Sequence, residues 1–222
     1  MLNIFTIAIL ESISLAFIGR KYNNSRMIEG IGISNLYLNC VLYYIYTGLL
    51  IGIENLCSNA LSLKNYKLMG YYFQRARIMA YFVSTFIAII HLFTLKYSLR
   101  LFTNKDNILD YCQINLRILL LQIIPGVQAA SLFKMLQVLE YGNICLYISG
   151  ICAILHPIWS WYLIFQFDLG IRGAAFSKLI TISLNAILSM WYLWNYHPYP
   201  QANFWINWKC FEIKGLIEYM KF

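Results

Sequence analysis

The chain of 222 residues is 60 % hydrophobic and only 12 % charged, and its mean hydropathy is +0.60. Soluble domains carry about 25 % charged residues, so this composition excludes a soluble globular protein. A net charge of +8 would suggest a nucleic-acid partner in a soluble protein. Here the basic residues lie between apolar blocks, where they anchor helices and attract anionic lipid. We therefore expect the lipid bilayer, and not nucleic acid, as the partner.

The apolar residues are gathered into blocks of about 20 residues, which is the length that crosses a hydrocarbon core. In chain order, the blocks predict helices at residues 2–18, 31–53, 78–95, 114–136, 144–167 and 173–196. His197-Pro198 ends the sixth block, because proline cannot continue a helix. We predict an all-α, multi-pass integral membrane protein whose residues 1–196 form a six-helix lobe. Residues 197–222 are expected to form a cytoplasmic linker and the start of an interfacial or seventh helix.

Two titratable side chains inside these blocks are candidates for proton coupling. Glu11 lies in the first block, where a carboxylate at bilayer depth is costly and tends to bind a proton. The alternative is that Glu11 lies near the membrane surface, because the block is short. His156 lies deep in the fifth block and titrates near neutral pH, so it could relay protons. The alternative is a neutral histidine that is hydrogen-bonded within the bundle.

Several amides and a tyrosine inside the blocks are candidates for a cavity that binds substrate. Asn35 and Asn39 are four residues apart and share a helix face, which Tyr43 continues. Gln128 and Asn185 lie in the middle of the fourth and sixth blocks. Buried amides at membrane depth need partners, so these residues either line a wet cavity or bond one helix to another.

A second group of residues is expected to act in gating or structure. Glu54 ends the second block, and Arg75 and Arg77 follow the next loop, so a salt bridge among them is the simpler interpretation. Pro125, followed by Gly126, predicts a kink in the fourth block, and Pro157 favours a bend beside His156.

The sequence contains no motif that indicates an enzyme. It has no Walker A loop, no H-E-x-x-H and no G-x-S-x-G, and its six cysteines form no C-x-x-C pair. We expect no catalytic residue, no bound metal and no cofactor.

Four segments, in the right order, resemble the multidrug and toxic compound extrusion (MATE) family, of the eukaryotic type. The segments are Phe17–Gly19, Glu54–Arg77, Pro125–Gln137 and Gly150–Ala175. The second segment is similar to the family's E-T-L-x-x-Q-A-x-G-A-x-x-Y-x-x-x-G-x-x-x-Q-R. The last is similar to its G-x-x-A-L-L-H and G-x-x-G-A-A. The chain departs from the family where Ser62 and Leu63 stand at a glycine and an alanine, and where Ser14 stands at the aspartate of bacterial members.

This resemblance implies the N-terminal lobe of a twelve-helix secondary transporter. Such a transporter exports organic cations, drugs or other xenobiotics by antiport, and the coupling ion is H⁺ or Na⁺. A parallel homodimer, or pairing with a second lobe, would complete it in the plasma membrane or in a vacuolar or other organelle membrane. The alternatives are a non-transporting remnant or interaction subunit of a full-length relative, and a lipid-linked flippase of the wider superfamily.

Overall fold

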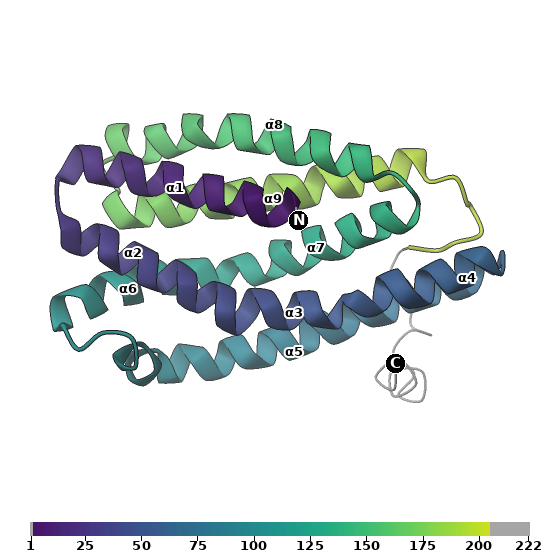
Figure 1. The fold of residues 1–222 in the computed structure, drawn as a ribbon, viewed down its shortest axis with the longest axis horizontal. Helices are drawn as coiled ribbons and strands as arrows, with labels where there is room; N and C mark the ends of the chain where they lie inside the picture. Colours follow the sequence, from purple (N-terminus) through teal and green to yellow (C-terminus); the bar gives the residue numbers. More distant parts are fainter. Residues whose placement is uncertain (1, 205–222) are drawn as a thin grey trace.

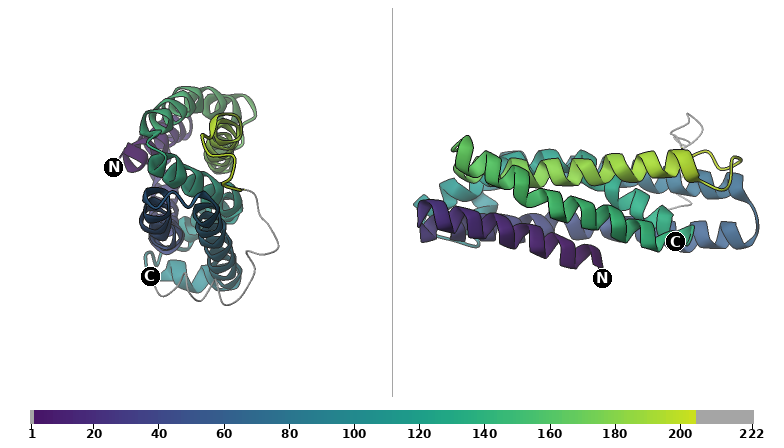
Figure 2. Two further views of the ribbon diagram at one scale, coloured as in Figure 1. Left: turned by 90° about the vertical axis from the view of Figure 1, so that its right-hand side faces the viewer. Right: turned by 90° about the horizontal axis from the view of Figure 1, so that it is seen from above.

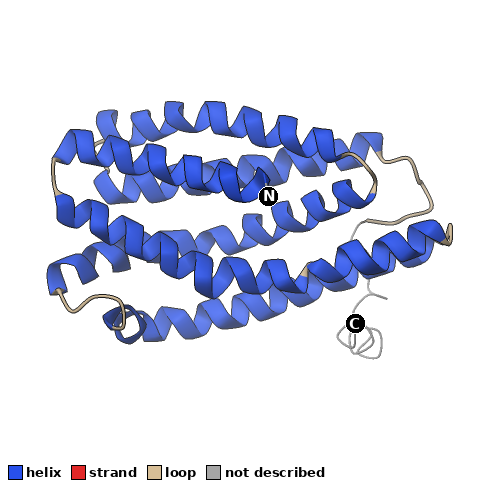
Figure 3. Cartoon of the chain, in the orientation of Figure 1, coloured by secondary structure: helices blue, strands red, loops and turns tan. Residues whose placement is uncertain are grey.

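The computed structural model describes residues 2–204, with side chains from residue 8 onward, and within this range it contains helices and no strand (Figures 1 and 3). Six helical segments run back and forth along the long axis of the molecule. In chain order they are α1 (Leu2–Tyr22); α2 (Ser25–Leu38) with η1 (Asn39–Tyr43), α3 (Tyr44–Leu49), η2 (Ile53–Cys57) and α4 (Ser58–Ser62); α5 (Tyr66–Arg100); α6 (Asp106–Leu119) with η3 (Leu120–Gln122) and α7 (Ile123–Val138); α8 (Gly142–Trp161) with η4 (Tyr162–Gln166); and α9 (Gly170–Tyr196).

These segments agree with an all-α membrane protein. Five of them, from α2 to α9, are long and apolar enough to cross a membrane. The remaining segment, α1, has 21 residues, which is also the length that crosses a bilayer core. Each expected block lies within one segment, except that the fifth extends one residue past η4. The expected interfacial or seventh helix lies mostly outside the described residues.

Short turns join the segments, and residues with a left-handed backbone sit in four of them. Asn23, Lys64, Glu140 and Asp168 have φ between 45° and 64°, and Gly170 has φ of 54°. A left-handed residue after a helix reverses the chain direction while its neighbours satisfy the last carbonyl groups. Two of the following helices begin with an asparagine cap: Asn24 accepts from the Arg26 N–H, and Asn65 accepts from the Leu68 N–H.

The segment α9 packs against α1, α6, α7 and α8, while α5 packs against α3, α6 and α7. The end-on view shows α5 on the side of the bundle opposite α8 (Figure 2). The exposed side of α5 is strongly apolar and includes Phe82, Phe86 and Phe93, which are 71 %, 59 % and 83 % exposed. Such a surface suits contact with lipid.

Close packing of α2 on α6 depends on Gly30. A Cβ atom at this position would lie 2.7 Å from Tyr111 Cβ, whereas at Gly32, on the same helix, nothing lies within 4 Å. Small residues let helix backbones approach closely in membranes, where packing drives association.

The helices depart from regular α geometry at places that the sequence predicted only in part. The fourth segment becomes a 3₁₀ turn at Leu120–Gln122, just before Pro125, whose missing N–H leaves the Leu121 carbonyl group unbonded by the helix. Pro157 lies inside α8, which continues for four more residues before the π-helical η4. The π-helical stretches η1, η2 and η4 carry no proline and were not expected.

Candidate functional site

A buried ion pair joins α1 to α9 in the middle of the lobe. Lys178 Nζ lies 2.6 Å from Glu11 Oε1, and the two side chains are only 8 % and 19 % exposed. Two amides of the second segment complete the cluster. Asn39 donates to the Glu11 carboxylate at 3.3 Å, and Asn35 accepts from the Lys178 ammonium group at 3.4 Å. Glu11 therefore lies within the bundle, and its charge is compensated there.

Asn39 reaches Glu11 from the π-helical stretch η1. A π turn holds one more residue than an α turn and changes which side chains face a neighbouring helix. Asn35 lies one turn earlier in α2 and meets Lys178 from the α-helical register. Asn39 and Tyr43 also line one cavity, and Asn35 lines a smaller one.

His156 forms a second polar cluster, and its ring has no exposed surface. Nδ1 lies 2.6 Å from Thr181 Oγ1, and Nε2 lies 3.1 Å from the hydroxyl oxygens of Ser14 and Ser160. The Thr181 hydroxyl group donates to the Ser177 carbonyl group, so Oγ1 is left to accept from Nδ1–H. A neutral ring with its proton on Nδ1 can donate to Thr181 and accept from a serine hydroxyl group at Nε2, which favours the interpretation of His156 as a neutral, hydrogen-bonded residue of the bundle.

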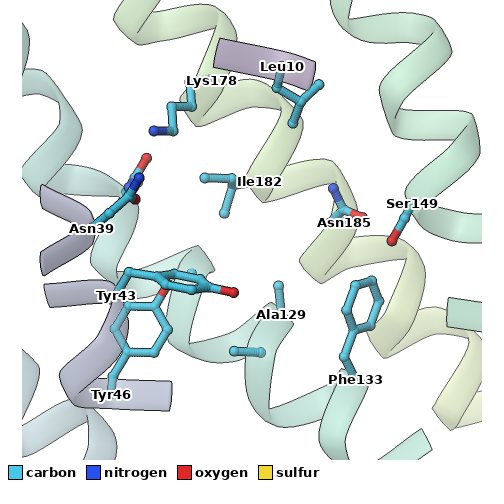
Figure 4. A pocket seen from close by; sticks show the side chains of 13 residues that line it. Leu10, Asn39, Tyr43, Tyr46, Ala129, Phe133, Ser149, Lys178, Ile182 and Asn185 are labelled. Atoms are coloured by element: carbon cyan, nitrogen blue, oxygen red, sulfur yellow. The ribbon is translucent and has the colours of Figure 1, made fainter. Parts of the chain in front are cut away.

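A cavity of about 80 Å³ opens between the helices beside Lys178 (Figure 4). It has room for several water molecules or part of a small ligand. Tyr43 and Tyr46 lie on one side of it, Asn185 and Ser149 on another, and Lys178 at its edge. Asn39, Gln122, Gly126 and Phe133 also line it. A second cavity of about 10 Å³ lies beside Glu11, Ser14 and Asn35, and Lys178 lines this one too.

The glycine of the predicted Pro125-Gly126 kink contributes to the cavity wall. A Cβ atom on Gly126 would lie 3.3 Å from the Tyr46 hydroxyl group, so a larger residue would crowd that ring.

One predicted cavity residue lies elsewhere. Gln128 is not among the residues that line the cavity. Its Oε1 accepts from the Tyr81 hydroxyl group at 3.0 Å, and its Nε2 lies 3.8 Å from Met190 Sδ. Gln128 therefore links α7 to α5 and α9, which agrees with the interpretation that such amides bond one helix to another.

The expected salt bridge between Glu54 and an arginine is wrong. Glu54 Oε1 lies 2.5 Å from Lys134 Nζ, which α7 brings against η2. Arg77 instead donates to the Phe204 carbonyl group and lies over the Phe73 ring, while Arg75 on the same helix is half-buried. The basic segment of α5 thus contacts the chain that follows α9, and not Glu54.

A third ion pair lies at the opposite end of the lobe from Glu54. Lys21, near the end of α1, lies 2.5 Å from Asp168 and donates to the Ile164 carbonyl group of η4 at 2.6 Å. The Tyr22 hydroxyl group also donates to Asp168. The hydrogen bond from Lys21, and to a smaller extent the one from Tyr22, lowers the pKa of the Asp168 carboxyl group.

The most important residue that sequence reasoning missed is Lys178. A lysine inside an apolar block is itself a signal, because a charge at membrane depth is rare and needs a partner. Gln122 and Ser149 were also missed. Nothing in the sequence distinguishes them from the other polar residues of the blocks, and only their place in the fold puts them at the cavity. Their place at the cavity depends on how α7 and α8 meet α9.

Comparisons with known proteins agree with the fold. A family model described as MatE matches residues 1–162. Protein DETOXIFICATION 16 of Arabidopsis thaliana is 25 % identical over 194 residues, which cover 83 % of this chain and 37 % of that protein. Protein DETOXIFICATION 23 of the same plant is 27 % identical over 180 residues, which cover 79 % and 35 %.

Solved structures show the same architecture. The eukaryotic MATE transporter AtDTX14 matches with a TM-score of 0.85 at 18 % identity, over 97 % of this chain and 47 % of that one. An inward-facing multidrug resistance MATE family transporter of the MOP superfamily matches with a TM-score of 0.80 at 12 % identity, over 95 % and 47 %. The chain spans about half the length of these structures and about a third of the curated relatives. The expectation of an all-α lobe of this architecture is confirmed.

Proposed function

Because the chain belongs to the MatE family, we propose that it is a membrane lobe of a secondary active transporter that exports small organic compounds. This family consists of transporters and not of enzymes. The observation that carries the proposal is the cavity between the helices, where Lys178 and three amides interrupt a mainly apolar wall, with a buried ion pair at its edge. A purely structural lobe has no need of a cavity or of charges at this depth, because both lower its stability.

Export against a gradient needs a coupling ion, and Glu11 is the better of the two candidates. His156 is sealed by hydroxyl groups that suit its neutral form. Glu11 is bound by Lys178, and a proton on its carboxylate would remove the negative charge and weaken this link between α1 and α9. Protonation of Glu11 would thus change the contact between two helices, as alternating access requires.

The surroundings of Glu11 favour H⁺ over Na⁺ as the coupling ion. The carboxylate is met by two donors, the Lys178 ammonium group and the Asn39 amide N–H. A sodium ion would need a shell of several oxygen ligands, and these donors would repel it. A proton needs only the carboxylate oxygen itself.

The test is transport by the purified protein in vesicles with an acidic interior. We expect uptake of a radiolabelled organic solute to require the pH gradient, to stop when a protonophore collapses it, and to be lost in Glu11→Gln. A sodium gradient should not replace the pH gradient. The variant Gln128→Leu, at an amide outside the cavity, is the matched control and should retain uptake. Uptake that persists in Glu11→Gln would refute this coupling, and absence of any uptake would favour a non-transporting interaction subunit.

We also propose that a second lobe pairs with this one. The support is that the chain matches about half of the solved transporters. A second copy of this chain, a separate protein or a further part of a longer chain could supply the other half. Cross-linking in native membranes, followed by sizing in mild detergent, tests the pairing, and finding only monomers in both would contradict it.

A further inference from the structure

The chain that follows α9 lies against the first turns of α5 as a non-helical strap, residues 197–204. Figure 1 shows it, in yellow, leaving the end of α9 and turning towards α5. Ala202 and Phe204 are only 3 % and 4 % exposed. The Ala202 N–H donates to the Tyr199 carbonyl group at 3.0 Å and closes a turn within the strap. The strap is therefore a packed part of the lobe.

The face of α5 beneath the strap binds its main chain. Gln74 Nε2 donates to the Asn203 carbonyl group, and Arg77 donates to the Phe204 carbonyl group at 3.3 Å. A Cβ atom on Gly70 would lie 2.7 Å from the Asn203 carbonyl oxygen and 3.0 Å from its amide nitrogen. Glycine allows this approach, and any side chain would displace the strap. Residues 70, 74 and 77 share one face of the helix.

Aromatic rings fasten both ends of the strap. Tyr199 stacks on Tyr66 with 4.2 Å between the ring centroids, and Phe204 packs edge-on against Phe73 at 5.7 Å. The Phe73 side chain has no exposed surface. Such ring pairs add to the stabilisation that comes from apolar burial. From Tyr66 to Arg77 the contacts cover about three turns of α5.

The position of the strap matters because α5 and α9 are otherwise joined mainly through α7. This helix packs against both, and its Gln128 contacts Tyr81 of α5 and Met190 of α9. The strap gives α9 a second attachment, at the end where the chain leaves the helix.

We infer that Gly70, Gln74 and Arg77 form a docking site for the main chain of the strap, and that the docked strap clamps the last turns of α9 to the first turns of α5. Gly70 and Gln74 belong to the part of the sequence that resembles G-x-x-x-Q-R, and neither is among the residues that line the central cavity. Main-chain docking accounts for both residue types, a glycine for close approach and an amide donor for a carbonyl group. The clamp does not depend on transport by the lobe.

Spin labels on Lys67→Cys and Gln201→Cys test whether the strap is docked. Both residues are exposed and line the same pocket between α5 and the strap, so the two labels should lie close together. Serine replaces Cys40, which is exposed, and Cys210, while the four other cysteines are buried and should not be labelled. With the protein in lipid nanodiscs, dipolar broadening of the EPR spectrum measures the fraction of molecules with a docked strap.

Variants of the docking face should open the strap. Gly70→Leu should reduce the broadened fraction at least twofold. Gly150→Leu, at an exposed glycine whose added Cβ atom would have nothing within 4 Å, is the matched control and should leave the fraction unchanged. Gln74→Leu combined with Arg77→Met removes both donors without adding bulk at Gly70, and should also reduce the fraction at least twofold. This double variant carries the test if Gly70→Leu does not fold.

Hydrogen–deuterium exchange tests the clamp on α9. When the strap is open, the amides of residues 190–196 should exchange at least tenfold faster, while those of residues 170–180 should keep their rate and show that the variant is folded. An EPR spectrum that stays broadened in both variants would mean that this face does not hold the strap. Unchanged exchange at residues 190–196 with an open strap would mean that the strap does not clamp α9. Either result would overturn the inference, and neither bears on the vesicle uptake that tests the proposed function.

Discussion

The Glu11–Lys178 pair should show strong energetic coupling, because losing either partner alone should destabilise the lobe more than losing both. Both side chains are less than a fifth exposed, so solvent screens their attraction only weakly. Removing one partner of a buried pair typically costs about 3–5 kcal/mol, because the other charge is left without compensation. Lys178→Met leaves the Glu11 carboxylate with a single donor at 3.3 Å, from Asn39, and should fall in that range.

The other two variants should cost less. Glu11→Gln keeps an oxygen near the lysine, which Asn35 also contacts at 3.4 Å. Its expected cost is about 1.5–3 kcal/mol, the value of a charged hydrogen bond. The double variant removes both charges, and replacing a whole buried pair is often close to neutral. Its cost should therefore be smaller than that of Lys178→Met alone.

The assay is a double-mutant cycle on the free energy of unfolding, measured by denaturant titration in detergent micelles with circular dichroism. The Glu54–Lys134 pair is the matched control, because its side chains are 38 % and 27 % exposed. A half-buried pair is screened more strongly by solvent than the Glu11–Lys178 pair, so Glu54→Gln and Lys134→Met should show weaker coupling, nearer the ~0–1 kcal/mol of surface pairs. Additive costs for Glu11→Gln and Lys178→Met, within about 0.5 kcal/mol, would refute the reasoning.

Three further predictions concern packing, pH and the histidine cluster. Gly30→Ala should destabilise the protein by about 1–3 kcal/mol, because its Cβ atom would lie 2.7 Å from Tyr111 Cβ. Gly32→Ala meets open space and should be neutral or slightly stabilising. Denaturant titrations measure the free energy of unfolding of both variants, and equal effects would contradict the prediction. Because the pKa of Asp168 is lowered in the folded protein, its ion pair with Lys21 contributes stability above the ordinary value of 3.8 and loses it as the pH falls through the lower folded pKa. The melting temperatures of the unmodified protein and of Asp168→Asn should therefore converge in that acid range. A difference between the two melting temperatures that grows on acidification would contradict this prediction. His156→Leu should lower the free energy of unfolding by about 2–4 kcal/mol, because it leaves buried hydroxyl groups without a partner. His91→Leu, at a half-buried ring bonded to its own helix, should lower it by less than about 1 kcal/mol. Similar melting temperatures for the two variants would show that the cluster around His156 does not stabilise the lobe.

The existence of the helices could be predicted from the sequence because burial in lipid acts on blocks of residues. Every apolar block became a helical segment, since only a helix satisfies the backbone in a bilayer. The ends could not be placed in this way. The segment α5 begins at Tyr66, 12 residues before its block, because its first turns pack on residues after α9, as the stacked rings of Tyr66 and Tyr199 show.

The site was less predictable because its pairs are distant in the sequence. Proximity suggested Arg75 or Arg77 as the partner of Glu54, yet Lys134 is the partner because α7 packs against η2. The apolar character of the sixth block hid Lys178, which meets a carboxylate 167 residues away. Glu11, Asn39 and Asn185 could be singled out as polar residues at membrane depth. Which of them share a cavity depended on the register of the helices.

The irregular turns show why that register matters to function. Each of the three π-helical stretches lies at an ion pair: η1 supplies Asn39 to Glu11, η2 carries Glu54 itself, and η4 offers the Ile164 carbonyl group to Lys21. The three pairs lie near the two ends and the middle of the lobe, and each joins helices that are not neighbours in sequence. Single π turns inside α-helices are frequent at functional sites. Protonation of Glu11 would leave Asn39 and Lys178 facing a neutral carboxyl group in place of a carboxylate, and so would act on η1 and α9 at the edge of the cavity.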